Sequence, residues 1–275
     1  MQTEILTNVV YEHLRDSKEK IVVEQGGTRS GKTYNILLYI IFKYCTDNVG
    51  KTITICRKTF PALRGTVMRD FFDILKERDI YREEFHSKST HEYHLNGNLV
   101  EFLSLDQSQK IRGRKRDFLF CNEANELTFE DWQQLIFRTT ERVVIDFNPS
   151  DEFHWIYDRV LTREDAEFYQ TSYLDNPFLS KTIVKEIERL KYIDENYWRV
   201  YGLGERGKSR SLIFNFSTIP NIPESAKLVG RGLDFGFTND PTALVETYVE
   251  GDNMYVKELL YRTGLTNQDI GNELK

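Results

Sequence analysis

Cysteine is scarce in this sequence, and so are long apolar runs. The three cysteines among 275 residues, Cys45, Cys56 and Cys121, are far apart and form no CxxC pair. This usage argues against a disulfide framework or a zinc site and fits a reducing compartment. The most apolar run, Ile36 to Phe42, is too short to span a bilayer. We therefore expect a buried helix there, no signal peptide and no membrane partner.

An excess of positive charge is also missing. The 37 Lys and Arg residues against 43 Asp and Glu residues give a formal net charge of −6. The surface as a whole therefore does not attract nucleic acid, and contact with DNA must come from local basic patches. Two such patches are present, Lys110–Arg116 and Arg206–Arg210. The five histidines form no spacing typical of a metal site, whereas the hydrophobic content of 40% is enough for a sizeable core.

The segment Gly26–Thr33 matches the phosphate-binding pattern G-x-x-x-x-G-K-[ST] at every specified position. An apolar run, Ile21–Val23, precedes it and a helix-like run, Tyr34–Tyr44, follows it. In such a loop, backbone N–H groups and the next helix N-terminus bind phosphate, Lys32 neutralises β- and γ-oxygens, and the Thr33 hydroxyl ligates Mg²⁺. The sequence therefore predicts a nucleotide site formed by Gly26, Gly27, Thr28, Arg29, Ser30, Gly31, Lys32 and Thr33.

Strand-like and helix-like runs alternate over the first 200 or so residues, which is typical of an α/β fold with a mostly parallel sheet covered by helices. The expected strands are Ile21–Val23, Thr52–Cys56, Phe118–Cys121 and Val143–Phe147. The expected helices are Tyr34–Tyr44, Val67–Arg78, Phe129–Phe137, Ser180–Tyr192 and Asp194–Tyr201. Asn96-Gly97 predicts a two-residue turn within an antiparallel pair at His91–Leu105, and Thr128–Asp131 predicts a helix-capping box.

The composition changes after residue 201. The segment Gly202–Arg210 is basic and rich in glycine, and Pro220 and Pro223 follow it, so we predict a linker. Short strand-like runs then predict the start of an antiparallel sheet at Leu228–Phe235, Thr242–Val249 and Met254–Tyr261, followed by a second capping box at Thr266–Asp269. The predicted divisions are a P-loop domain at residues 1–201, a linker at 202–226 and an incomplete second domain at 227–275.

Two polar residues, Asn122 and Glu123, follow the apolar run Phe118–Cys121. In a P-loop enzyme that hydrolyses its nucleotide, we expect an acidic pair to end a strand beside the P-loop strand. The first carboxylate holds the Mg²⁺ shell and the second polarises the attacking water. Glu123 supplies the second group, whereas Asn122 supplies an uncharged amide that can contact the metal only through water. We predict that Glu123 is catalytic; the alternative is that it merely follows a buried strand.

Arginine side chains are needed as well, because cleavage of the γ-phosphate spreads negative charge that an arginine stabilises. Arg29 lies within the P-loop itself, and Arg112 lies in the basic patch before the Glu123 strand. We predict a catalytic role for both; the alternative for Arg112 is a solvated basic loop. Weaker candidates are Arg57 and Arg64.

Asn148 and Asp234 each lie at or just beyond the end of a predicted strand. Asn148 is a candidate for sensing hydrolysis at the γ-phosphate, and an ordinary Asn-Pro turn is the alternative. Asp234 suits metal-dependent phosphodiester cleavage, which needs several carboxylates around two metal ions. The nearby acids Asp240, Glu246 and Glu258 are expected to be surface charges.

The order and spacing of these segments resemble the large terminase subunit of tailed double-stranded DNA phages, the motor that packages the genome. The resemblance runs through Gly26–Thr33, Arg57–Arg64, Arg112-Gly113, Asn122–Glu126, Phe147–Pro149, His154-Trp155, Asp175–Phe178, Tyr201–Gly207 and Asp234–Gly236. It implies an ATPase that uses ATP and Mg²⁺, with Glu123 as catalytic residue, Asn148 as coupling residue, and Arg112 or Arg29 as arginine finger. It also implies an RNase H-like nuclease in which Asp234 binds Mg²⁺ or Mn²⁺.

The resemblance further implies partners. Family members form rings, usually pentamers, on the portal protein of the empty procapsid in the host bacterial cytoplasm, and a small terminase subunit recruits the double-stranded DNA. The remaining nuclease carboxylates would fall beyond Lys275, so we expect this chain not to cut DNA. Two alternatives stay open. One is another P-loop nucleic-acid motor, such as a helicase or recombinase; the other is a nucleic-acid-binding or nuclease module with a vestigial P-loop, which Asn122 favours.

Overall fold

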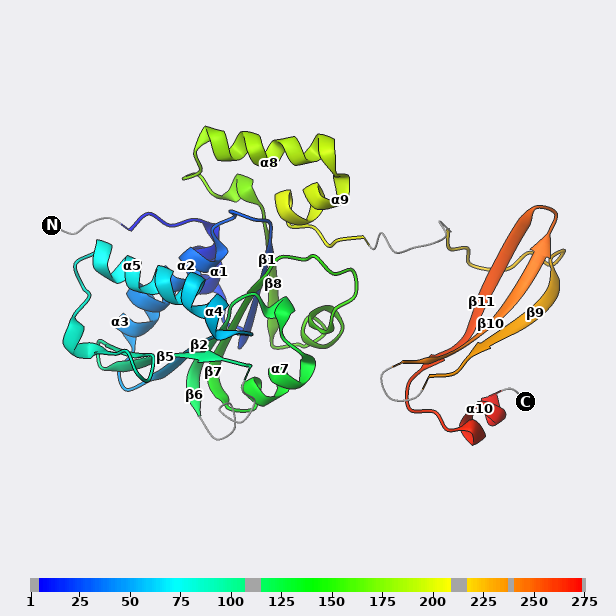
Figure 1. The fold of residues 1–275 in the computed structure, drawn as a ribbon, viewed down its shortest axis with the longest axis horizontal. Coiled ribbons are helices and arrows are strands. Elements are labelled where there is room, and N and C mark those ends of the chain that lie inside the picture. Colours follow the sequence, from blue (N-terminus) through cyan, green and yellow to red (C-terminus); the bar gives the residue numbers. More distant parts are fainter. Residues whose placement is uncertain (1–4, 107–114, 209–216, 237–239, 274–275) are drawn as a thin grey trace. The chain divides into compact units, whose positions relative to one another are not determined.

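The chain folds into two compact units, Met1–Arg210 (unit 1) and Ser211–Lys275 (unit 2). The structure is a computed structural model that describes residues 5–106, 115–208, 217–236 and 240–273. Figure 1 shows both units, and each is described by itself. Among the described residues, no helix is both long and apolar enough to cross a bilayer.

Unit 1 is built on an eight-stranded sheet with the order β3-β4-β5-β2-β6-β7-β1-β8. All neighbours from β5 to β8 in this order pair in parallel, and β3, β4 and β5 pair antiparallel at one edge. The α/β fold with a mostly parallel sheet is therefore confirmed. The strands are β1 (Ile21–Gly26), β2 (Thr52–Arg57), β3 (His86–Ser87), β4 (Glu92–Leu95), β5 (Asn98–Ser104), β6 (Arg116–Cys121), β7 (Thr139–Phe147) and β8 (Ala166–Thr171).

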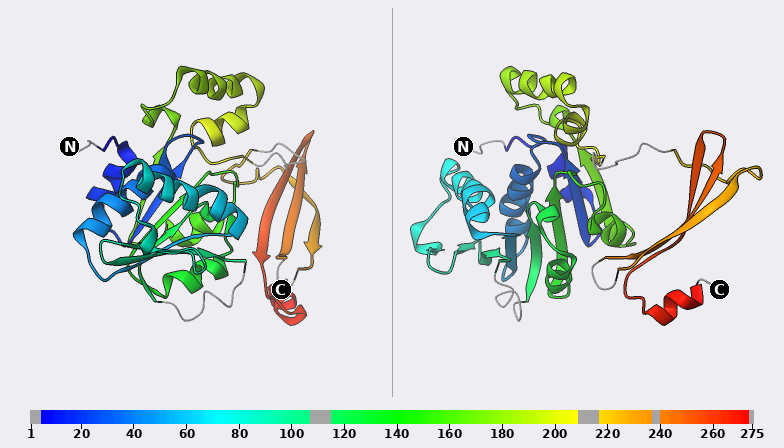
Figure 2. Two further views of the ribbon diagram at one scale, coloured as in Figure 1. Left: turned by 60° about the vertical axis from the view of Figure 1, so that its left-hand side comes forward. Right: turned by 45° about the vertical axis from the view of Figure 1, so that its right-hand side comes forward.

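Helices cover both faces of this sheet (Figure 2). Strand residues alternate between two apolar clusters, so that Val22 and Val144 pack toward α1, α2 and α5, while Val23 and Ile145 pack toward α7. The helices of unit 1 are α1 (Val9–Asp16), α2 (Lys32–Tyr39), α3 (Cys45–Asp47), α4 (Phe60–Leu63), α5 (Arg69–Glu77), α7 (Phe129–Ile136), α8 (Lys181–Ile193) and α9 (Glu195–Tyr197). A π-helical segment, Ile40–Tyr44, joins α2 to α3.

Local signals in the sequence predicted several turns and caps correctly. Asn96 and Gly97 have φ angles of 50° and 77° between the antiparallel strands β4 and β5, as the two-residue turn requires. Thr128 and Asp131 form the predicted capping box at the start of α7. Helix α1 and strand β8 were not predicted. The β8 edge strand has a mainly half-exposed, mixed sequence, and the α1 helix has only two buried residues.

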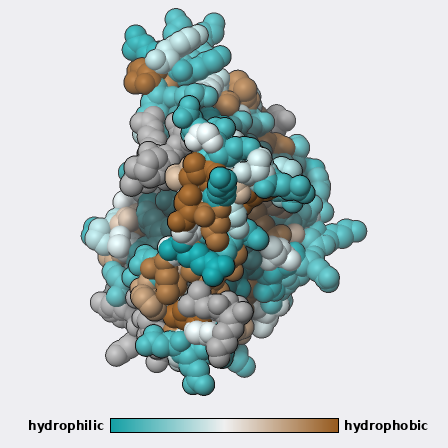
Figure 3. All heavy atoms as spheres, turned by 90° about the vertical axis from the view of Figure 1, so that its right-hand side faces the viewer, coloured by the Kyte–Doolittle hydropathy of each residue, from teal (hydrophilic) through white to brown (hydrophobic). Residues whose placement is uncertain are grey.

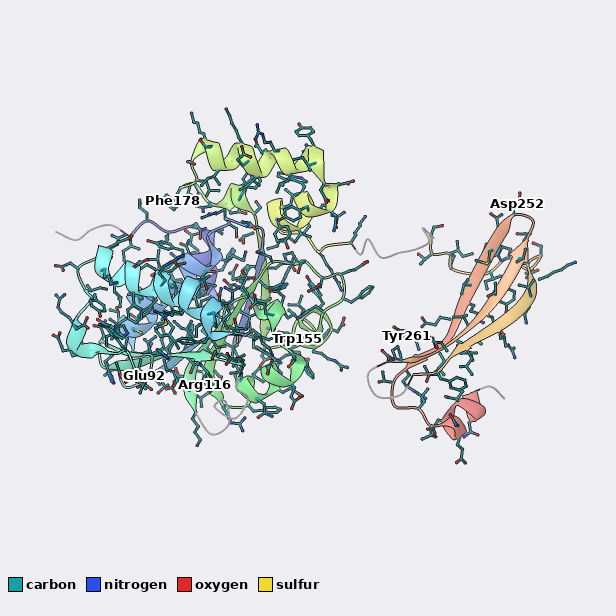
Figure 4. The ribbon with its side chains drawn as sticks, viewed as in Figure 1. Glu92, Arg116, Trp155, Phe178, Asp252 and Tyr261 are labelled. Atoms are coloured by element: carbon teal, nitrogen blue, oxygen red, sulfur yellow. The ribbon has the colours of Figure 1, made fainter. Side chains whose placement is uncertain are left out.

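Unit 2 contains a three-stranded antiparallel sheet with the order β11-β10-β9, followed by helix α10. Its elements are β9 (Lys227–Asp234), β10 (Thr242–Glu250), β11 (Asn253–Arg262) and α10 (Asn267–Glu273). Asp252 lies in the turn between β10 and β11, and Tyr261 lies near the end of β11 (Figure 4). Large apolar side chains are exposed on this unit, and hydrophobic patches are visible on the face seen in Figure 3. These exposed residues are Ile219, Leu228, Val229, Phe235, Met254, Val256, Leu259 and Tyr261.

Candidate nucleotide site

The P-loop connects the buried strand β1 to helix α2. Gly31 has a φ of +85° and precedes the first helical residue, a conformation that L side chains rarely adopt. Arg29 also has a positive φ, 65°, although it is not a glycine. These two residues turn the chain so that the loop lies at the N-terminus of α2, where a phosphate would meet backbone N–H groups.

Lys32 folds back over the P-loop. Its Nζ donates to the carbonyl oxygens of Gly26 (2.9 Å) and Gly27 (3.0 Å), and to the side-chain oxygens of Ser30 (3.2 Å) and Asn148 (3.1 Å). Burial lowers the pKa of the Lys32 ammonium, while three nearby acidic groups act in the opposite direction. A nucleotide phosphate would offer this ammonium stronger, charged partners than the neutral oxygens it now contacts.

Asp146 joins the P-loop to the ends of strands β6 and β7. Its Oδ2 accepts from the Thr33 hydroxyl at 2.6 Å, and its Oδ1 accepts from the Glu123 N–H at 2.9 Å and from Asn122 Nδ2 at 3.0 Å. The side chain is 1% exposed. Sequence reasoning missed Asp146, although its signal was present. Asp146 lies inside the apolar run Val143–Phe147, and an aspartate is almost never buried unless it is paired.

The expected position of the acidic strand in the sheet is wrong. Asn122 and Glu123 follow β6, and β7 separates β6 from the P-loop strand β1. Of the two strands beside β1, β7 carries Asp146 instead. The pair still reaches the P-loop, because the carboxyl ends of parallel strands lie at one edge of the sheet, and Asn122 Nδ2 donates to Thr33 Oγ1 at 3.2 Å.

Glu123 has an unusual backbone conformation, with φ 51° and ψ 58°. A non-glycine residue in this left-handed region is strained, and such strain clusters at functional sites. Burial and the nearby Asp146 raise the pKa of the Glu123 carboxyl to about 7, while Lys32 and Arg57 act in the opposite direction. A carboxylate with this pKa can accept a proton from water near neutral pH.

The arginine candidates have different surroundings. Arg112 lies outside the described residues. The Arg29 side chain is exposed, and its backbone carbonyl accepts from Asn176 Nδ2 at 2.8 Å. Arg57 is held by a bidentate ion pair with Glu126, with a closest N–O distance of 2.8 Å.

Two segments distant in sequence hold the P-loop in place, and neither was predicted. Asn8 caps helix α1 and donates from Nδ2 to the carbonyl oxygen of Ser30 at 2.8 Å. The carbonyl oxygen of Tyr201, at the end of the helical stretch after α9, accepts from the Thr28 N–H at 2.7 Å. The carbonyl oxygen of Gly204 accepts from Gln25 Nε2 at 2.7 Å. Tyr201 is the last residue of the predicted first domain and Gly204 lies in the predicted linker, so the start of that segment is bonded to the P-loop and to the strand before it.

A cavity of about 380 Å³ lies beside the P-loop. Thr28 and Arg29 line it from the loop, and apolar and aromatic side chains of α8 and the stretch after α9 complete it. These include Ile183, Leu190 and Tyr201. The predicted nucleotide residues therefore border a partly apolar space large enough for a small ligand group.

Asp234 stands apart from this network. It is the last residue of β9, pairs with Ala243 on β10, and has an exposed side chain. The expectation of surface charge is wrong for Glu246, which is 6% exposed and forms an ion pair with Arg231 at 2.7 Å. Because side chains alternate along a strand, Arg231 and Glu246 lie on the opposite face of the sheet from Asp234. No group of three or more metal-ligating side chains occurs in the parts of the chain that the structure describes.

Comparison with known proteins finds one family. Residues 18–205 match the family model described as "Phage terminase large subunit". Relatives include the PBSX phage terminase large subunit of Bacillus subtilis (strain 168), 22% identical over 91% of this chain and 66% of the relative. The large terminase subunit of Bacillus phage SPP1 is 26% identical over 83% of this chain and 60% of the relative. This chain thus spans less than two thirds of the length of either relative.

Among solved structures, a large terminase from a thermophilic bacteriophage, determined in complex with ADP, has the same fold. It matches with a TM-score of 0.62 at 19% identity, covering 98% of this chain and 73% of that one. This match extends over both units of the chain.

Proposed function

Because this chain belongs to the phage terminase large subunit family, we propose that unit 1 hydrolyses ATP to drive double-stranded DNA into a viral procapsid. The observation that carries the proposal is the convergence of Lys32, Thr33, Asp146 and Glu123 at the P-loop. A helicase or recombinase is not favoured, because the family model covers the segment from before β1 to the residues after α9.

The residues at the end of β6 and β7 fit a hydrated Mg²⁺. The Thr33 hydroxyl and the Asp146 carboxylate are oxygen ligands of the kind that Mg²⁺ prefers, and they are 2.6 Å apart. Asn122 Oδ1 is buried and has no hydrogen-bond partner among the described residues, so it can accept from a metal-bound water. When bound, Mg²⁺ neutralises charge on the β- and γ-phosphates.

Each residue then has a defined task. The P-loop backbone, residues 26–31, cradles the phosphates, and the Lys32 ammonium moves from the loop carbonyls to the phosphate oxygens. Glu123 takes a proton from the attacking water as the water oxygen bonds to the γ-phosphorus. The bond from the γ-phosphorus to the β–γ bridging oxygen breaks, which gives ADP and phosphate. Arg112, or Arg29 from within the loop, stabilises the charge on the transferred group.

Asn148 and the segment after α9 would carry the signal of hydrolysis. Asn148 Oδ1 accepts from Lys32 Nζ at 3.1 Å, so a shift of the lysine toward a phosphate would change this contact. Tyr201 is bonded to Thr28 of the P-loop and Gly204 to Gln25 just before it, and the chain continues from there toward unit 2. A change in the loop would thereby move the start of the linker, and through it the DNA.

The partners are those implied for a packaging motor. We propose that the chain assembles as a ring, with the pentamer expected, on the portal protein, and receives double-stranded DNA from a small terminase subunit. The basic patches are the proposed DNA contacts, without Arg116. This last residue of the first patch is 1% exposed, so the expectation of a DNA contact is wrong for it. The cations that remain are those of residues 110–115 and of Arg206–Arg210. In unit 2, Asp234 is the proposed first ligand for Mg²⁺ or Mn²⁺ of a nuclease site.

Substitution of the catalytic glutamate tests the proposed ATPase. We expect Glu123→Gln to lower kcat for ATP by about 10²–10⁴-fold, since it removes the general base, and to leave ADP affinity within about twofold. Glu130→Gln, in which an exposed glutamate of α7 is changed in the same way, is the matched control. Steady-state phosphate release and a fluorescent-ADP titration give the two quantities. An unchanged kcat would exclude Glu123 as the base, and a wild-type chain that binds no nucleotide would refute the proposed function.

A further inference from the structure

We propose that Asp146, at the end of β7, supplies the carboxylate that holds Mg²⁺ in this chain, in the place where position 122, at the end of β6, has only an amide. The negative charge at this site thus lies on β7, beside the strand on which the sequence pattern predicts it. This inference rests on the proposed ATPase function and assigns a metal-site residue within it.

The sheet register makes positions 122 and 146 equivalent. Cys121 is paired with Ile145 in the parallel β6–β7 ladder, so the next residues along the two strands lie side by side. Both point to the face covered by α2, because Phe120 and Val144, two residues earlier, belong to the apolar cluster on that face. A carboxylate at either position therefore approaches the same point at the start of α2.

The contacts of Asp146 are those of a positioned ligand. Thr33, the residue that the P-loop pattern assigns to Mg²⁺, donates its hydroxyl proton to Asp146 Oδ2 at 2.6 Å. The Glu123 N–H and Asn122 Nδ2 donate to Oδ1, at 2.9 and 3.0 Å. The carboxylate is thus aimed at the metal-binding hydroxyl and is fixed by the two residues that follow β6.

The same contacts explain why position 122 has an asparagine and not an aspartate. Asn122 and Asp146 are 2% and 1% exposed, and a carboxylate at both positions would bring two negative charges together in a buried place. The Asn122 amide instead donates to the carboxylate, and its Oδ1 is left buried without a partner among the described residues. Positions 122 and 146 therefore hold one negative charge between them, and in this chain it is on Asp146 of β7.

Asp146 could instead have a purely structural role, as an anchor for the strained Glu123 backbone. An anchor must be at position 146, whereas a metal ligand can be at either position 122 or position 146. Exchange of the two side chains separates the roles. The double substitution Asn122→Asp with Asp146→Asn returns the carboxylate to β6, keeps the amide beside it and leaves composition and net charge unchanged. A metal site tolerates this exchange, because both positions face the same point. A structural anchor does not, because an amide at position 146 has one acceptor oxygen where the carboxylate has two, one for Thr33 Oγ1 and one for the Glu123 N–H.

The experiment measures metal binding directly. Mn²⁺ is titrated by electron paramagnetic resonance into the full chain saturated with ADP, for the wild type, Asp146→Asn and the exchanged double variant; thermal denaturation reports folding. We expect Asp146→Asn to bind Mn²⁺ about 10–100-fold more weakly, and the double variant to recover to within about threefold of the wild type. Should Asp146→Asn not fold, Asp146→Ser serves as the charge-free variant.

The outcomes separate the two proposals. Wild-type affinity for Mn²⁺ in the charge-free variant overturns the role of Asp146, and so does a folded double variant that stays as weak as the single one. A wild-type chain that binds neither ADP nor ADP-dependent Mn²⁺ refutes the proposed function itself, and the role of Asp146 falls with it.

Discussion

Glu123 in unit 1 and Asp234 in unit 2 lie at or near the end of a strand, yet their surroundings differ in every respect. Glu123 has a strained backbone, is partly buried, and is bonded through its N–H to Asp146, which in turn contacts the P-loop. Asp234 is exposed, and its neighbour Glu246 is paired with Arg231 on the other face of the sheet. A reactive site thus depends on several segments that bury and orient one group, and strand position alone does not create it.

The two units differ first in how closely the backbone is packed around their glycines, and a substitution can test this difference. A Cβ on Gly27 would lie 2.5 Å from the carbonyl oxygen of Gly202 and 2.7 Å from that of Tyr201, whereas a Cβ on Gly230 of β9 would meet nothing within 4 Å. We expect Gly27→Ala to destabilise unit 1 by about 3 kcal/mol, because backbone atoms must move, and Gly230→Ala to change stability by less than about 0.5 kcal/mol.

Calorimetry of the whole chain measures both variants, with hydrogen exchange assigning each transition to its unit. Gly27→Ala should also weaken ADP binding, since the displaced loop is the proposed phosphate-binding segment. Equal effects of the two substitutions would show that the segment from Tyr201 to Gly204 does not pack on the P-loop, and the contrast between the units would be lost.

Much of unit 1 follows from local sequence patterns, and the missing parts have a common physical cause. The P-loop, the capping box at Thr128 and the turn at Asn96-Gly97 depend on residues adjacent in sequence, so their chemistry is visible in the chain. Asn8 and Tyr201 reach the P-loop across more than 20 and 170 residues, and no local pattern encodes such contacts.

Asp146 lies between these cases. The apolar strand around it was predicted, but its role depends on the register between β6 and β7, which the sequence does not provide. The placement of β7 between β6 and β1 likewise depends on chain topology. The predicted domain boundaries and the role of Arg112 remain predictions.

Charge burial provides the second prediction. The pKa of Glu123 is raised from its ordinary 4.5 to about 7, so the folded chain holds this proton more tightly than the unfolded chain. Well below pH 4.5 the folded and the unfolded chain both carry this proton, and ionisation has no effect on stability. The penalty grows as the pH rises through 4.5 and is nearly complete above about pH 7. Without metal or nucleotide, Glu123→Gln should therefore stabilise unit 1 by about 3 kcal/mol at pH 8 and by less than about 0.5 kcal/mol at pH 4.5.

Urea denaturation in EDTA at the two pH values measures this effect. Glutamine keeps the left-handed backbone at this position, so relief of strain does not contribute to the difference. Asp234→Asn is the comparison from unit 2, and its exposed side chain should leave stability unchanged at both pH values. A pH-independent effect of Glu123→Gln would show that its carboxylate is not destabilised by its surroundings.

Helix capping gives the smallest and most selective contrast. Asn8 accepts from the Val10 N–H and donates to Ser30 of the P-loop, whereas the Thr266 side chain bonds, among the described residues, to Asp269 of its own capping box. Asn8→Ala should cost about 1 kcal/mol of stability and lower ADP affinity roughly fivefold, because the cap and the P-loop share this side chain. Thr266→Ala should cost about 0.5 kcal/mol and leave ADP affinity unchanged. Calorimetric titration with ADP distinguishes them: if Asn8→Ala lowers stability but not affinity, Asn8 acts as a helix cap alone, and the P-loop is held from the α9 side.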